Sequence, residues 1–270
     1  MVRKSYFLVL CLVLAAPLLA WTHVGRENVV DVRIVADNGS EFTKHRVYPR
    51  CQQQGNFFYV EAAKGDRYSI RVTNKTGRRV GVVVAVDGRN IISAKKSDLK
   101  PNDRMYIIGP HETNVFEGWR TAMDTTNRFY FTEQSDSYAE KVFGDASAMG
   151  TIALAVYKEK IPEIVPYSDK RFRMNESPAG AAPSASGESR SADKAKLQKG
   201  EEAGTGFGET TYSPARVVQF EPEHRAAEKI VLKYEWRSEL CRKGIISCDP
   251  KNRFWPDDQE FAPIPKDFKG

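Results

Sequence analysis

The stretch VGVVVAVDGRN, residues 80–90, decides the fold class of this 270-residue chain. Its valines occupy every second position from 80 to 86 and alternate with Gly81, Val83 and Ala85. A period of two is that of a β-strand, because successive side chains point to opposite faces. Asp87-Gly88 follows directly, and this dipeptide between two apolar runs favours a type I′ turn with positive φ at both central residues. The stretch therefore predicts a strand that ends in a tight hairpin.

The same alternation recurs over residues 29–161. Short runs rich in β-branched and aromatic residues lie at 30–34, 68–72, 129–131 and 152–156. Turn residues separate them at 64–66, 74–77 and 100–103, and residues 135–143 favour a loop with a short helical turn. Short, regularly spaced strands without long helices predict a mainly β fold for residues 21–165. The expected architecture is an antiparallel β-sandwich of jelly-roll or immunoglobulin-like type.

The first twenty residues have the pattern of a signal peptide. Arg3 and Lys4 precede an apolar run that ends at Ala20. This run is shorter than the roughly 20 apolar residues that span a bilayer, and Pro17 disfavours a continuing helix. We expect cleavage after Ala20 and export to the periplasm or the extracellular space, with an uncleaved anchor as the alternative. No transmembrane span is expected in the mature chain.

The charge of the chain argues against a nucleic-acid partner. The formal net charge is +6, and loss of Arg3 and Lys4 with the leader lowers it by two, to +4. The basic residues are interspersed with acids, unlike the dense Lys/Arg field of a nucleic-acid-binding surface. We therefore expect an envelope or extracellular protein or a glycan as the partner.

Three cysteines remain after cleavage. Cys241 and Cys248 have six residues between them and can close a small disulfide loop in an oxidising compartment, which leaves Cys51 as an odd thiol. The alternative pairs Cys51 with one of the two late cysteines. The sequence has no C-x-x-C motif and no histidine at ligand spacing from a cysteine, so neither a metal nor a cofactor is expected.

Residues 166–206 are predicted to be a disordered linker. Nineteen of the thirty residues from 177 to 206 are Ser, Ala, Gly or Pro. Such a segment has too few large apolar side chains to offset the loss of conformational entropy on ordering. Order is expected again over residues 207–248, a small β+α module with strands at 215–220 and 229–234. A helix is compatible with 235–243, with Gly244 as its C-terminal cap. We expect this module to pack back on the sandwich or to rely on the disulfide, and residues 249–270 to form an extended Pro- and aromatic-rich tail.

A set of short motifs carries a resemblance to a known group of proteins. They are residues 60–62, 64–74, 84–90, 118–120, 137–138 and 150–152, with Phe129 and Phe131, and, after the linker, 204–209 and 212–214. In these motifs the chain resembles a family of uncharacterised exported bacterial proteins. The resemblance implies a β-rich protein of the periplasm or the extracellular space, and it implies no activity. The Cys241 and Cys248 pair and the tail fall outside that pattern.

Two clusters are candidates for ligand binding. The loop Asp87-Gly-Arg89-Asn90 can present three polar side chains to a ligand, or it can be a hairpin turn that needs these residues for its backbone. Trp119, followed by Arg120, can form an aromatic platform for a sugar ring. The alternative for Trp119 is a core position at a strand end.

The sequence predicts no catalytic motif. Five carboxylates in the sandwich region could include an acid/base pair: Asp66, Asp87, Glu117, Asp124 and Glu133. Our leading hypothesis is an exported, non-enzymatic interaction protein of the envelope or the extracellular space. A carbohydrate- or cell-wall-binding module is the first alternative, and a secreted carboxylate-dependent hydrolase is the second.

Overall fold

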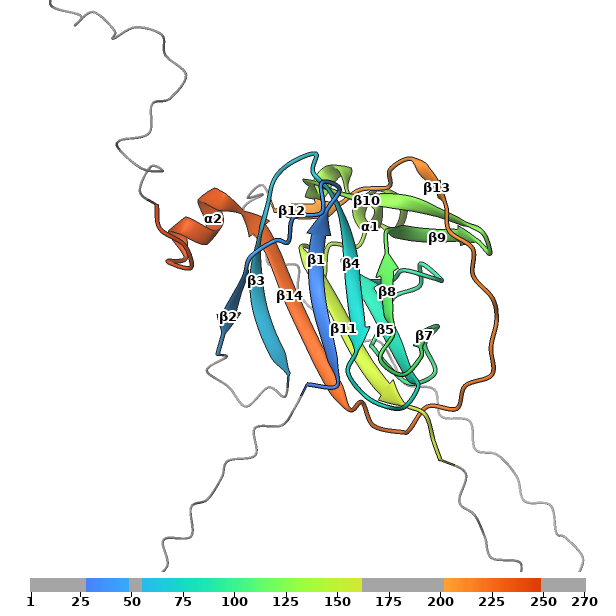
Figure 1. Ribbon diagram of the computed structural model, residues 1–270. Coiled ribbons are helices and arrows are strands. Elements are labelled where there is room, and N and C mark those ends of the chain that lie inside the picture. Colours follow the sequence, from blue (N-terminus) through green and yellow to red (C-terminus); the bar gives the residue numbers. More distant parts are fainter. Residues whose placement is uncertain (1–27, 49–54, 162–201, 249–270) are drawn as a thin grey trace, which may run out of the picture.

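The computed structural model describes residues 28–48, 55–161 and 202–248, and this part of the chain is mainly β, with 47% strand and 9% helix (Figure 1). Two sheets of seven strands each form a β-sandwich, as the alternation of apolar residues predicted. The predicted signal peptide, Cys51, the predicted tail and most of the predicted linker lie outside the described residues.

The first sheet has the order β1-β4-β10-β12. Its strands are β1 (Val30–Ala36), β4 (Arg67–Asn74), β10 (Thr125–Glu133) and β12 (Ala203–Thr205). Three shorter strands join this path: β8 (Thr113–Phe116) pairs with β4, whereas β9 (Gly118–Ala122) and β13 (Thr210–Tyr212) pair with β10. All these pairs are antiparallel, as expected.

The second sheet has the order β2-β3-β14-β11-β5-β6. Its strands are β2 (Lys44–Val47), β3 (Asn56–Ala62), β14 (Glu228–Trp236), β11 (Thr151–Lys158), β5 (Val80–Val86) and β6 (Arg89–Asn90), with β7 (Tyr106–Ile108) paired to β5. The β3–β14 pair is parallel, which departs from the antiparallel arrangement that we predicted. Figure 1 shows β14 running beside β3 through the middle of this sheet.

The position of β14 corrects the predicted domain organisation. Residues 207–248 pack on the sandwich, as one of the two expectations has it, but they are not a small module of their own, because β14 lies between β3 and β11 and completes the second sheet. The predicted linker also ends too late, since its residues 203–205 form β12 and are buried. The strand predicted over 215–220 is absent from the structure, where Val217 and Val218 are exposed between Pro214 and Pro222.

The core lies between the two sheets, where the inward residues of each strand meet. The four alternating valines of β5 pack there with Ile34, Ile70, Phe129 and Leu232. Val83, on the other face of β5, belongs to a second small cluster with Tyr157, Leu99 and Met105. Both faces of β5 are therefore buried, which explains why this strand is almost entirely apolar.

Two short helices carry the caps that their sequences indicate. Helix α1 (Tyr138–Phe143) begins after Ser137, whose hydroxyl accepts a hydrogen bond from the Glu140 amide, and ends at Gly144 with a φ of 59°. A 3₁₀ turn, η1 (Gln134–Asp136), precedes it. Helix α2 (Arg237–Arg242) follows β14 directly and is followed by Gly244 with a φ of 69°. Both glycines adopt the left-handed conformation that ends helices without a Cβ penalty.

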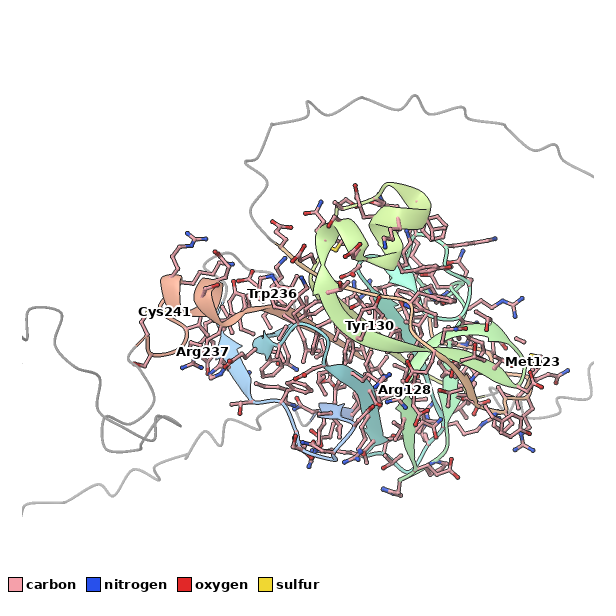
Figure 2. All side chains as sticks on the ribbon, turned by 90° about the horizontal axis from the view of Figure 1, so that it is seen from above. Met123, Arg128, Tyr130, Trp236, Arg237 and Cys241 are labelled. Atoms are coloured by element: carbon pink, nitrogen blue, oxygen red, sulfur yellow. A yellow bond between two sulfur atoms is a disulfide. The ribbon has the colours of Figure 1, made fainter. Side chains whose placement is uncertain are left out.

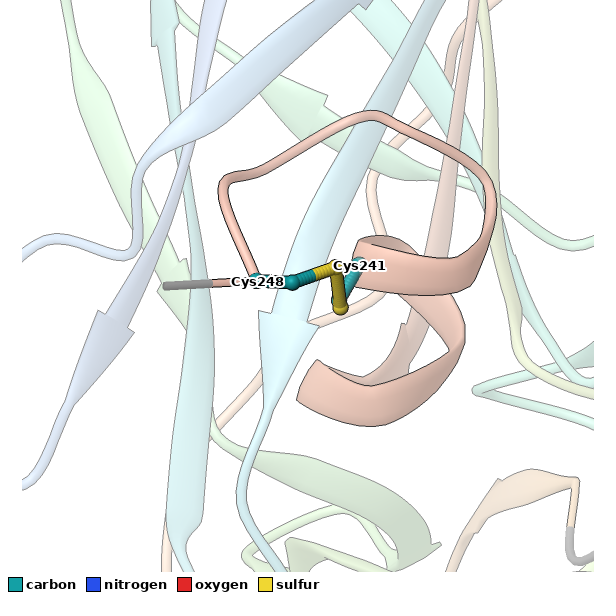
Figure 3. The surroundings of a disulfide bond; sticks show 2 residues. All are labelled: Cys241 and Cys248. Carbon is teal, nitrogen blue, oxygen red and sulfur yellow. A yellow bond between two sulfur atoms is a disulfide. The ribbon is translucent and has the colours of Figure 1, made fainter. Parts of the chain in front are cut away.

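The predicted cysteine pair is confirmed. Cys241 of α2 and Cys248 lie at disulfide-bonding distance, with Cα atoms 5.0 Å apart, and close a short loop after the helix (Figure 3). In Figure 2, Cys241 and Arg237 mark one end of the molecule and Met123, in the β9–β10 turn, marks the other. The disulfide therefore closes a peripheral loop and does not connect the two sheets.

Candidate functional site

Asp87 occupies the hairpin turn that the sequence predicted. Asp87 has a φ of 47° and Gly88 a φ of 77°, the two positive values of a type I′ turn between β5 and β6. The Asp87 side chain, however, points inward and its residue is only 1% exposed. The turn therefore places a carboxylate inside the protein rather than on a loop surface.

Four donors surround the Asp87 carboxylate. Its Oδ1 accepts hydrogen bonds from the Gly150 amide at 2.9 Å, the Thr151 amide at 3.3 Å and the Tyr234 hydroxyl at 2.6 Å. Its Oδ2 accepts one from the Thr205 amide at 2.7 Å. One carboxylate thus connects the β5–β6 turn to the start of β11, to β12 and to β14.

The hydroxyl groups continue this cluster toward the first sheet. The Thr205 Oγ1 lies 2.6 Å from the Tyr234 hydroxyl and 2.7 Å from the Tyr68 hydroxyl. Because Tyr234 donates its proton to Asp87, Thr205 donates to Tyr234 and accepts from Tyr68. We call Asp87, Tyr234, Thr205 and Tyr68 the Asp87 chain. It runs between strands of both sheets.

Burial sets the protonation of the Asp87 chain. It raises the pKa of Asp87 to about 6, although the hydrogen bonds from Tyr234, Thr205, Thr151 and Gly150 oppose the shift. Burial also raises the pKa of Tyr68 and Tyr234 well above that of a free tyrosine. Both tyrosines therefore remain hydrogen-bond donors at neutral pH. The four residues of the Asp87 chain are enclosed in the core, so their observed role is to hold strands of the two sheets together.

Arg89 and Asn90 support neighbouring loops. The Asn90 Nδ2 donates to the Arg104 carbonyl at 2.7 Å, and its Oδ1 accepts from the Ile92 and Ser93 amides. The Arg89 Nη2 donates to Asp145 at 2.9 Å. Its guanidinium also stacks on the Phe143 ring, 4.1 Å from the ring centre. These contacts favour the hairpin-turn interpretation over a ligand-binding loop.

Trp119 lies in the core and not on a platform. It is 2% exposed, and its Nε1 donates to the Gly206 carbonyl at 3.0 Å. Its ring meets Phe129 edge-on at 5.3 Å and lies 4.7 Å from the Tyr138 ring. A sugar cannot stack on a ring that other aromatic rings cover, which counts against the predicted platform.

Arg120 is held by the fold as well. Its Nε donates to the Tyr106 hydroxyl at 2.7 Å, and its Nη1 donates to the Ser213 carbonyl at 2.8 Å. Its backbone amide donates to the Ile91 carbonyl, beside Asn90. The structure therefore brings the two predicted clusters next to each other through the backbone, while their side chains have separate partners.

The aromatic side chains that are partly exposed near Trp119 are Phe143 and Phe207, which the sequence did not indicate as surface residues. Phe207 stacks on Tyr138 at 5.0 Å, and Phe143 meets Tyr138 edge-on at 5.5 Å. Phe143 and Phe207 are each 40% exposed. Phe207 follows the glycine-rich residues 204–206, and no alternating pattern marks it as a surface residue.

The glycines of residues 204–208 have a packing role. A Cβ on Gly204 would lie 2.6 Å from the Ser137 Cβ, and one on Gly206 would lie 2.1 Å from the Tyr130 ring. The segment therefore needs glycine because it passes closely over η1 and β10. This close packing explains why several glycines follow one another in this segment.

The predicted acids have separate surroundings. Glu133 pairs with Lys64 at 2.5 Å, Glu117 pairs with Arg128 at 3.4 Å, and Asp124 accepts a hydrogen bond from the Thr125 hydroxyl. Asp87 is enclosed in the core. Glu117, Asp124 and Glu133 therefore lie on the first sheet and its turns with different partners, whereas Asp87 belongs to the β5–β6 turn of the second sheet.

No family model, curated protein or solved structure matches this chain. The resemblance to exported bacterial proteins therefore stays a prediction. Within the described ranges, no group of three or more His, Cys, Asp or Glu side chains is placed to hold a metal ion. No helix in the same ranges has the length and apolar character needed to cross a membrane.

Proposed function

We propose that this chain is an exported, non-enzymatic protein of the envelope or the extracellular space that acts by binding another molecule. The leader-like residues 1–20 support export. The Cys241–Cys248 pair is compatible with it, because disulfides persist in oxidising compartments.

The observation that supports a binding role is that the polar residues predicted as a site, Asp87, Asn90 and Arg120, hold the fold together instead of facing a ligand. Asp87, Asn90 and Arg120 satisfy backbone groups from distant segments. A sandwich held in this way is a rigid frame, and such frames commonly present binding residues on the loops at their ends.

The two alternative functions, a carbohydrate-binding module and a hydrolase, each need a surface feature of their own. A carbohydrate-binding module needs an accessible polar or aromatic surface, which Trp119 does not supply. A carboxylate-dependent hydrolase needs two acids about 5–10 Å apart that face a common cleft.

Crosslinking on living cells tests the proposal. Cells that make the full chain are treated with a crosslinker that does not cross the inner membrane, and the protein is then analysed by its mass on denaturing gels. We expect adducts of higher mass, because an exported binding protein is accessible and has a partner. Unmodified chain in treated cells, with a known periplasmic protein crosslinked in the same sample, would contradict the proposal.

A further inference from the structure

An open groove lies at the end of the sandwich where β1, β3 and β14 begin, lined by residues just before or at these strand starts. The starts of the three strands are at the bottom of Figure 1. The groove has a volume of about 1340 Å³. A second hollow of about 600 Å³ shares Asn28 and Val29 with it and extends it toward Lys75 and Lys158. We call the two together the end groove.

The end groove concentrates positive charge. Among the described residues that line it, six are Lys or Arg and two are Asp or Glu: Arg46, Lys75, Lys100, Lys158, Arg225 and Lys229 against Asp98 and Glu228. His224 adds a further basic side chain. This excess matches the +4 predicted for the whole mature chain, so the groove differs from the mixed surface around it.

Both acids of the groove already have partners. The Glu228 carboxylate accepts hydrogen bonds from the Val29 and Val30 amides and from the Asn56 side chain, and so holds the start of β1 to β14. Asp98 pairs with Lys100 at 2.9 Å. Within the described part of the chain, neither acid therefore forms an ion pair with Arg225, Lys229 or Lys158.

Several of those cations face solvent without an acceptor. Arg225 and Lys229 are exposed, and neither they nor the half-buried Lys158 has a hydrogen-bond or ion-pair acceptor within the described ranges. Lys158 comes from β11, Lys229 from β14, and Arg225 from the segment that leads into β14. Cations fixed on separate, well-packed elements keep their spacing, which suits a ligand with repeated anionic groups.

We propose that the end groove binds an anionic polysaccharide. Its Lys and Arg side chains would pair with the carboxylate or phosphate groups, and the exposed Asn28 offers hydrogen bonds to sugar hydroxyls. Among the described residues that line the groove, Tyr157 is the aromatic one. It is buried, and its hydroxyl donates a hydrogen bond to the Leu99 carbonyl. The lining therefore lacks the exposed rings on which nucleic-acid bases stack.

This inference rests on the proposed binding function and names its ligand class. The test measures binding of the full mature chain to polygalacturonate, to neutral dextran of the same length and to a single-stranded oligonucleotide. The groove variant is Arg225→Glu with Lys229→Glu. The matched control is Arg216→Glu, an exposed arginine on the same connecting segment and outside the groove lining.

We expect polygalacturonate to bind, more weakly as salt is raised, and dextran not to bind. The two charge reversals should weaken binding about tenfold, because each replaces an attraction by a repulsion, while Arg216→Glu changes it less than about twofold. Circular dichroism of both variants should match that of the wild type, since the replaced side chains are exposed.

Three results would overturn the inference: no binding of polygalacturonate, equal loss in the groove variant and the control, or tighter binding of the oligonucleotide. Crosslinking on cells separates its failure from that of the proposed function. If the groove variant gives the same adducts as the wild type and polygalacturonate does not bind, the binding function stands and the groove assignment is wrong.

Discussion

Asp87 serves both the backbone and the core. Its position before Gly88 allowed the turn to be predicted from two adjacent residues, because turn geometry is local. Its buried carboxylate could not be predicted, since the donors at positions 150, 205 and 234 are far away in the sequence and become neighbours only in the folded sheet. The same limit applies to Trp119, whose burial depends on Tyr138 and Gly206.

Replacing Asp87 by asparagine should destabilise the protein. The side-chain NH₂ group of asparagine is a donor and would face the Thr205 amide or the Tyr234 hydroxyl, which now donate to a carboxylate oxygen. One of these buried donors would then have no acceptor. Leaving buried donors unpaired costs about 2 kcal/mol of the free energy of unfolding. Urea denaturation at pH 7 measures this loss. Asp124→Asn, on an exposed turn, is the control and should change stability by less than about 0.5 kcal/mol.

The pH dependence of stability gives a second prediction for Asp87. Its pKa rises from 3.8 to about 6 on folding, so between these values the folded state binds more protons than the unfolded state. The contribution of Asp87 to stability is therefore present below the unfolded pKa and is lost as pH rises toward 6, by at most about 3 kcal/mol.

Urea denaturation of wild type and Asp87→Asn at pH 4.5 and pH 7 isolates this effect, since the other carboxylates are common to both proteins. The stability advantage of the wild type should be larger at pH 4.5. An advantage that is equal at both pH values, or larger at pH 7, would show that the Asp87 carboxylate is not destabilised by burial.

At the scale of elements, alternation predicted strands well and their partners poorly. β1, β4, β5, β10, β11 and β14 all coincide with predicted apolar runs. The parallel pairing of β14 with β3 could not be predicted, because strand order depends on contacts between distant segments. Residues 215–220 have strand-like composition but pair with no strand in the described part of the chain, and Val217 is 80% exposed.

Leu232→Ala should test whether β14 belongs to the main core. Leu232 is fully buried between the sheets, so removing most of its side chain should cost about 3 kcal/mol and lower the single unfolding transition of the whole protein. Urea denaturation followed by tryptophan fluorescence and by circular dichroism measures it.

Val218→Ala, on the exposed segment before β14, is the matched control and should have little effect. Two separate transitions in Leu232→Ala, with only the later one at the wild-type position, would indicate an independent C-terminal module and contradict the observed integration of β14.

At the scale of the molecule, sequence and structure agree on a mainly β sandwich, and the structure adds that the C-terminal strand β14 completes the second sheet. The alternation of apolar residues allowed the fold class to be predicted, and the leader-like residues 1–20 predict the compartment. The binding surface could not be predicted from motifs, because the described lining of the end groove collects side chains from seven separate places in the sequence: 28–29, 46, 55–56, 75–76, 98–101, 157–158 and 224–229.

Export is the claim on which the proposed function depends most directly. The decisive measurement is the intact mass of the protein recovered from the periplasm and from the medium of cells that make the full chain, before and after reduction. We predict a chain that begins at Trp21 and gains the mass of two hydrogens on reduction, as the Cys241–Cys248 pair opens. A chain recovered from the cytoplasm with residues 1–20 intact and both thiols free would contradict it.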